Sequence, residues 1–152
     1  MKRAARRPLP LGAMVPPMAP LASLAKYHDV GLFILRAGVG VMFMTHGIPK
    51  LARGSEGWER LGHTMALVGI DFAPTFWGLL AGLTETFGGL CLVLGLWTRA
   101  VCLPLAFTMV MAALNHLAQG DGLGKASHAI EACFVFLGLF FAGPGRYSLD
   151  KR

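Results

Sequence analysis

Charged residues are scarce in this chain. Only 14% of its 152 residues are Asp, Glu, Lys or Arg, whereas 55% are hydrophobic. A soluble domain of this size has a large surface for its volume and needs many charged side chains to cover it. The composition therefore excludes an ordinary soluble fold. The few charges are grouped between long apolar runs, which indicates an integral membrane protein.

Cysteine is scarce too, and no two cysteines have the C-x-x-C spacing of a zinc site or a thioredoxin-type motif. Cys91, Cys102 and Cys133 all lie inside apolar runs, where a small buried hydrophobic side chain is the simplest role. We therefore expect neither a disulfide framework nor a metal site. The net charge of +6 does not indicate nucleic-acid binding, because the basic residues do not line one soluble face.

Four apolar runs predict four transmembrane helices, since one span needs about 20 residues. The predicted spans are 30–48, which we expect to end before Pro49, and then 74–96, 100–117 and 127–142. Short links between the later spans favour an all-α, antiparallel four-helix bundle over residues 30–150. Residues 1–29 are basic and rich in proline, so we expect a disordered cytoplasmic tail rather than a signal peptide.

The loop after the first span has its own pattern. Its apolar residues recur at helical spacing and predict a short helix lying in the membrane interface: Trp58, Leu61, Met65 and Val68. Aromatic side chains also fall near the predicted span ends, as in the aromatic belt of a membrane protein: Tyr27, Trp77, Trp97 and Tyr147.

The basic residues predict the orientation. With four spans both termini lie on one side, and that side carries most of the basic residues outside the spans: Lys2, Arg3, Arg6, Arg7, Lys26, Arg99, Arg146, Lys151 and Arg152. The other side carries fewer: Lys50, Arg53, Arg60 and Lys125. Because cytoplasmic loops are enriched in Lys and Arg, we expect both termini in the cytoplasm.

Arg36 and Glu85 are ionisable residues inside predicted spans. Such residues are costly in a membrane and are therefore functional candidates. At about 1.5 Å per residue, the two lie about 3 Å apart in depth, so we expect an Arg36–Glu85 ion pair. The pair would serve function or only fix the helix register. Glu85 shares a helix stripe with glycines, so it faces a helix or a cavity rather than lipid.

A second polar cluster lies near the outer ends of three spans. His46, His116 and Glu131 all fall about 5 Å below the outer face, and Lys50 follows His46 on the same helix face. Three helices would thus bring donors, acceptors and a proton carrier to one level. The competing interpretation is that polar side chains near span ends simply extend to water.

Several short segments resemble one family when they are taken in order. They are Leu35-Arg36-Ala37-Gly38, His46-Gly47-Ile48-Pro49-Lys50, Glu85-Thr86-Phe87-Gly88-Gly89, Leu94-Gly95-Leu96-Trp97-Thr98-Arg99 and Gly143-Pro144-Gly145-Arg146-Tyr147-Ser148-Leu149-Asp150. This set resembles the DoxX family of small bacterial membrane proteins over about residues 30–150. The resemblance implies a four-helix fold in the bacterial cytoplasmic membrane. For some members it implies association with membrane oxidoreductase complexes, and for relatives with a thiosulfate:quinone oxidoreductase.

The leading functional hypothesis is a small subunit or partner of a quinone-linked membrane oxidoreductase system. His46, Lys50, His116 and Glu131 would supply hydrogen bonds and protons to a quinone headgroup. No flavin, nicotinamide or iron–sulfur motif is present, so electrons would come from a redox partner protein. The alternatives are a proton-coupled transporter using Glu85, a b-type haem protein using His46 and His116, and a non-catalytic assembly protein. Whether the chain is itself an enzyme, or forms a homo-oligomer, stays open.

Overall fold

The computed structural model describes residues 23–150, and every regular element in this part of the chain is helical. A 3₁₀ helix, η2 (Ser23–Tyr27), leads into the first long helix, α2 (His28–Ala52). The remaining elements are α3 (Gly54–Gly62), the 3₁₀ helix η3 (His63–Val68), α4 (Pro74–Leu94), α5 (Thr98–Ala118) and α6 (Gly122–Ala142). The predicted all-α fold is confirmed.

Four of these helices, α2, α4, α5 and α6, are long and apolar enough to cross a membrane. They correspond to the four predicted spans, and two boundaries differ by more than two residues. Helix α2 continues past Pro49 to Ala52, and α6 begins at Gly122, before the apolar run itself. Residues 23–29 of the expected disordered tail are helical. The rest of that tail, residues 1–22, lies outside the described residues.

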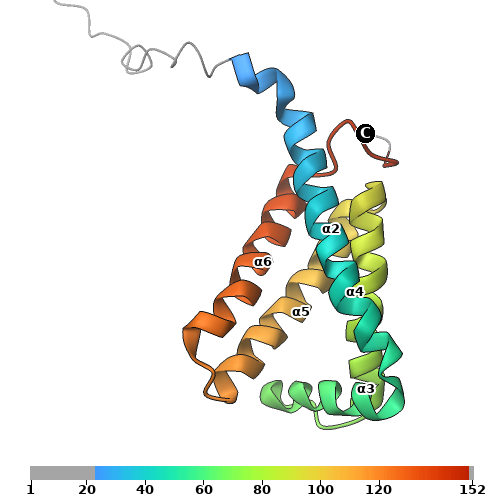
Figure 1. The fold of residues 1–152 in the computed structure, drawn as a ribbon, viewed down its shortest axis with the longest axis vertical. Helices are drawn as coiled ribbons and strands as arrows, with labels where there is room; N and C mark the ends of the chain where they lie inside the picture. Colours follow the sequence, from blue (N-terminus) through green and yellow to red (C-terminus); the bar gives the residue numbers. More distant parts are fainter. Residues whose placement is uncertain (1–22, 151–152) are drawn as a thin grey trace, which may run out of the picture.

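Successive long helices run in opposite directions, and they form two close pairs (Figure 1). Helix α2 packs against α4, α5 packs against α6, and α4 joins the two pairs through its contact with α5. The start of α2 and the end of the chain lie at one end of the bundle, here called the termini end. At the other end, called the α3 end, α3 and η3 run crosswise (Figure 1). They form the predicted first-loop helix, whose place in a membrane interface stays a prediction.

The two helix pairs meet through an apolar core. Phe43 of α2 and Phe136 of α6 form an edge-to-face contact with ring centroids 4.7 Å apart. Leu92, Leu105 and Leu139 are fully buried beside them, on α4, α5 and α6. This core lies between the termini end and the polar residues of the α3 end, and it fixes the relative positions of the helices that carry those residues.

The C-terminal segment Gly143–Asp150 folds back over the termini end. The backbone N–H groups of Leu149 and Asp150 donate to the carbonyl oxygens of Leu94 and Gly95, at 3.2 and 2.9 Å. The Asp150 carboxylate accepts hydrogen bonds from the backbone N–H groups of Trp97 and Thr98, at 2.8 and 2.9 Å. Asp150 therefore caps the N-terminus of α5 from a distant part of the chain.

Candidate functional site

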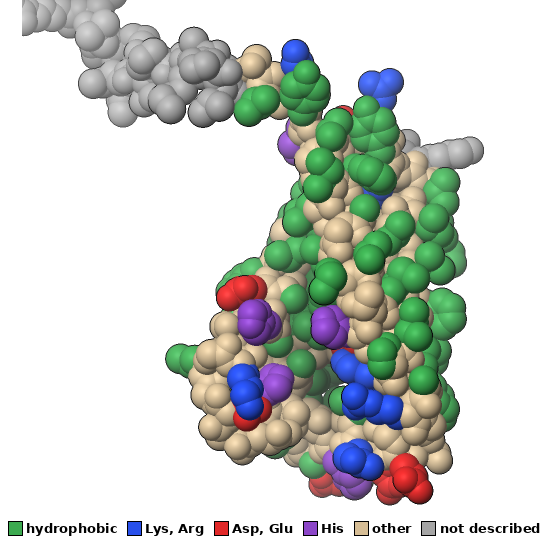
Figure 2. Space-filling view, in the orientation of Figure 1, with side chains coloured by type: hydrophobic (Ala, Val, Ile, Leu, Met, Phe, Trp, Pro, Cys, Tyr) green, Lys and Arg blue, Asp and Glu red, His purple; other side chains and the backbone are tan. Residues whose placement is uncertain are grey.

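A cavity of about 350 Å³ lies toward the α3 end. Helices α4 and α5 form most of its wall, the α3–η3 segment closes it, and the end of α2 contributes Lys50. Its polar lining consists of Lys50, Thr64, Thr84, Glu85, Thr108, Asn115 and His116, and its apolar lining includes Met65, Trp77, Leu80, Pro104, Phe107 and Met111. Figure 2 shows the surface hollowed at this end, with Lys and Arg side chains on both sides of the hollow and histidine beside it.

Lys50 and Glu85 form an ion pair in the cavity wall. The Nζ atom of Lys50 lies 2.6 Å from Oε1 and 2.7 Å from Oε2 of Glu85, so both carboxylate oxygens accept from one ammonium. The Glu85 side chain is 1% exposed, whereas that of Lys50 is 26% exposed. The ammonium of Lys50 therefore neutralises the Glu85 carboxylate, which water does not reach.

The close approach of α2 and α4 makes this pair possible. A Cβ atom at Gly47 would lie 2.4 Å from Oγ1 of Thr86, and one at Gly89 would lie 2.6 Å from the carbonyl oxygen of Gly40. Only glycine fits at such distances, so the two helix backbones come close together. Pro49 lies inside α2, and the helix continues one turn beyond the predicted span end, so Lys50 lies on a helix.

Arg36 does not pair with Glu85, so the predicted Arg36–Glu85 ion pair is wrong. Arg36 is fully buried at the termini end and donates from its guanidinium to the carbonyl oxygens of Pro144 and Tyr147. Side chains on a helix lean toward its N-terminus. Arg36 on α2 therefore leans toward the termini end and Glu85 on α4 toward the α3 end. The two residues also lie at different depths: Gly47 is the α2 residue beside Glu85, and Arg36 precedes it by 11 residues, or about 16 Å along the helix.

His116 lines the cavity from the last turn of α5. Its Nδ1 atom lies 2.8 Å from Oδ2 of Asp121, in the turn between α5 and α6. The other carboxylate oxygen of Asp121 accepts a hydrogen bond from Nζ of Lys125, at 2.7 Å. These two hydrogen bonds, Lys125 first, lower the pKa of the Asp121 carboxyl below its ordinary value. Asp121 thus connects His116 in the cavity wall to Lys125, whose side chain is 67% exposed.

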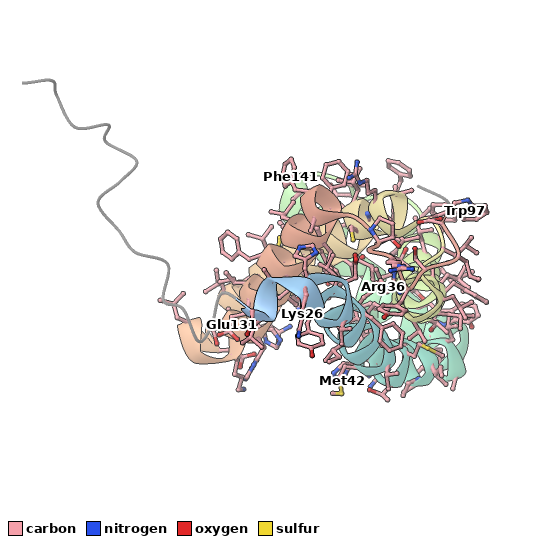
Figure 3. The ribbon with its side chains drawn as sticks, turned by 90° about the horizontal axis from the view of Figure 1, so that it is seen from above. Lys26, Arg36, Met42, Trp97, Glu131 and Phe141 are labelled. Atoms are coloured by element: carbon pink, nitrogen blue, oxygen red, sulfur yellow. The ribbon has the colours of Figure 1, made fainter. Side chains whose placement is uncertain are left out.

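His46 and Glu131 are both exposed, and neither lines the cavity. His46 lies on α2 one turn before Lys50, and Glu131 lies on α6. Viewed along the bundle, Glu131 lies at the periphery, whereas Arg36 points in among the helices (Figure 3). The predicted outer cluster is therefore only partly assembled: Lys50 and His116 line one cavity, together with Glu85 from outside that cluster, and His46 and Glu131 lie outside the cavity.

Asp121 is a site residue that the sequence pattern does not indicate. It lies between Gly120 and Gly122, where an aspartate is read as an ordinary turn residue. The available signal was its spacing: Asp121 precedes Lys125 by four residues and follows His116 by five. The threonines of the cavity wall were also missed, because a single hydroxyl in an apolar run has no distinctive pattern.

Four membrane-spanning helices with a partly polar internal cavity define the class: a small helical membrane protein with an interior site of ligand size. The DoxX family profile matches residues 31–117, which include the ion pair and His116. The chain therefore belongs to the DoxX family.

Three bacterial proteins are similar in sequence to this chain over most of its length. The uncharacterized membrane protein Rv3486 of Mycobacterium tuberculosis is 34% identical over 135 residues, covering 78% of each chain. The inner membrane protein YqjF of Escherichia coli is 30% identical over 84% of this chain and 95% of its own. The putative oxidoreductase CatD of Bacillus subtilis is 26% identical over 82% of this chain and 88% of its own. No solved structure gives a significant match.

Proposed function

We propose that this protein binds the headgroup of a membrane quinone in the cavity at its α3 end, as a small subunit or partner of a membrane oxidoreductase system. The observation that carries the proposal is the cavity itself. An apolar wall that suits a lipid-soluble ring surrounds one ion pair, Lys50–Glu85, and one histidine, His116.

The residues of the cavity fit such a headgroup. Its volume of about 350 Å³ falls within the range of about 300–1,000 Å³ that small-molecule sites occupy. The apolar residues Leu80, Pro104 and Phe107 would pack against a planar ring, and Lys50 and Asn115 carry N–H donors suited to ring carbonyl oxygens. A bound quinone would supply reversible electron transfer coupled to the uptake and release of protons.

The proposal includes a redox partner. No flavin, nicotinamide or iron–sulfur motif is present in the sequence, so electrons would have to come from another protein. The name of the Bacillus subtilis relative, a putative oxidoreductase, supports a redox role for the family, although it specifies neither a quinone nor a partner.

The main alternative, a proton-coupled transporter, would use Glu85 as a proton-carrying carboxylate. Such a role requires the carboxylate to be free of a cation in at least one state. Lys50 neutralises Glu85 with both hydrogen bonds in the described structure. We therefore favour ligand binding, with the ion pair as part of the wall.

Calorimetric titration of the purified full chain in lipid nanodiscs tests the proposal, with a short-chain benzoquinone and a short-chain naphthoquinone as probes. We expect saturable binding of at least one probe. Ala81→Phe, which places a ring inside the cavity, should weaken it at least about tenfold, or about 1.4 kcal/mol. Ala118→Phe is the matched control, since Ala118 is exposed and outside the cavity. Wild-type protein without saturable binding, or an Ala81→Phe variant that binds equally well, would contradict the proposal.

We further propose that the protein lies in the bacterial cytoplasmic membrane with both termini in the cytoplasm, so that the cavity is near the outer face. The excess of Lys and Arg in the N-terminal tail and at the termini end supports this orientation. Reporter fusions after Lys26, Gly62, Trp97, Gly122 and Arg152 should alternate between cytoplasmic and periplasmic signals. A periplasmic signal at Arg152 would overturn it.

A further inference from the structure

Asp121 occupies the N-cap position of α6 without capping that helix. An aspartate at this position ordinarily accepts a hydrogen bond from a backbone N–H of the first helical turn. Here the side chain makes no such bond. Its two oxygens accept instead from Nδ1 of His116 and Nζ of Lys125. A common structural role therefore does not explain this aspartate, and its contacts point to His116.

The contact determines which nitrogen of His116 carries hydrogen. Hydrogen bonds from Lys125 and His116 lower the pKa of the Asp121 carboxyl and keep it ionised. An ionised carboxylate can only accept hydrogen bonds. The Nδ1 atom of His116 must therefore be the donor across the 2.8 Å contact. In the neutral ring, the second nitrogen, Nε2, is then an acceptor, and it is the nitrogen that Asp121 does not hold.

His116 lies between the cavity and water. Its side chain lines the cavity and is nevertheless 38% exposed. Asp121 is 22% exposed, which leaves the carboxylate well placed to stabilise a positive charge on the ring without being fully solvated. The other ionisable groups of the cavity wall, Lys50 and Glu85, neutralise each other. His116 is therefore the cavity residue best suited to pass protons to water.

We propose that His116 is the proton-exchange residue of the cavity and that Asp121 is its positioning residue; the identity of the ligand rests on the proposed function. A ligand hydroxyl hydrogen-bonded to Nε2 gives its proton to the ring. The O–H bond breaks, an N–H bond forms, and the oxygen keeps the electron pair. Asp121 stabilises the resulting imidazolium, and the Nε2 proton then leaves to water. This acid–base step needs no oxidant or reductant.

Nitrogen NMR of the full chain with ¹⁵N-labelled histidine, in nanodiscs, tests the positioning role. We expect the neutral ring of His116, assigned by the loss of its signals in His116→Gln, to carry hydrogen on Nδ1. Asp121→Ala should remove this signature, and Asp121→Asn, which keeps the size of the side chain, should weaken it. Lys125→Met is the matched control, because Lys125 contacts Asp121 but not His116, and it should leave the tautomer unchanged. An Nε2–H tautomer in the wild type would overturn the assignment.

Addition of a short-chain quinol tests the exchange step. We expect the Nε2 signal of His116 to shift on quinol binding in the wild type, and this shift to be lost in Asp121→Ala. A quinol that binds by calorimetry while the Nε2 signal stays in place would overturn the proton-exchange role. A flat calorimetric titration would instead overturn the proposed function, so the two failures are distinguishable.

Discussion

Replacing Lys50 with methionine should destabilise the protein more than replacing Glu85 with glutamine, although both changes break the same ion pair. Lys50→Met leaves a carboxylate that is 1% exposed without a cation. Stranding a buried charge in this way costs about 3–5 kcal/mol of unfolding free energy. Glu85→Gln leaves the ammonium of Lys50, which is 26% exposed and can be hydrated. The expected loss is then about 1.5–3 kcal/mol, the range for a hydrogen bond to a charged group.

The double variant Lys50→Met/Glu85→Gln measures the interaction free energy between the two side chains, apart from the effect of each single change. Because it leaves no unpaired charge, its loss should be smaller than the sum of the two single losses by about 0.5–3 kcal/mol. The assay is unfolding of the purified chain in mixed micelles by increasing SDS, followed by tryptophan fluorescence. Arg60→Met is the control, since it removes a charge from an exposed position on α3 and should change stability by less than about 0.5 kcal/mol.

Two results would refute this reasoning. If Glu85→Gln costs as much as Lys50→Met, the difference in exposure does not determine the cost. If the single losses add in the double variant, Lys50 and Glu85 do not interact, and Glu85 has another partner in the membrane.

Three other substitutions test the contacts that hold the C-terminal segment, the start of α5 and the α2–α4 pair in place. Arg36→Met should leave the partly buried carbonyl groups of Pro144 and Tyr147 without their donor, costing about 2–5 kcal/mol and exposing the C-terminal segment to limited proteolysis. Asp150→Ala should remove the distant cap of α5 and lower the unfolding free energy by about 1 kcal/mol in the same SDS titration. Gly47→Ala should lower the melting temperature because its Cβ would overlap Thr86, whereas Gly38→Ala, with nothing within 4 Å, should not; equal effects would show that helix propensity and not close packing matters.

Hydropathy predicted the four spans because crossing a membrane is a local property of each segment. About 20 apolar residues suffice wherever they occur in the chain. The short helix after the first span was likewise visible in the spacing of its apolar residues. Pro49 was misread because proline lacks the N–H that a helix interior requires, yet α2 continues through it to Ala52.

Hydropathy and residue types were enough to establish the class of protein, the number of spans and most of the polar groups inside the bundle. Which of those polar groups meet depends on how the helices pack. Depth counted from the predicted span ends placed Arg36 level with Glu85, whereas Gly47 is the α2 residue beside Glu85. Depth also specifies neither the face of the helix nor the lean of the side chain. Antiparallel helices lean their side chains in opposite directions, so Lys50 and Glu85 converge, whereas Arg36 reaches back to the C-terminal segment. Asp121 lies in the turn between α5 and α6, and the conformation of that turn brings it against His116; its spacing of five residues from His116 was the available local signal.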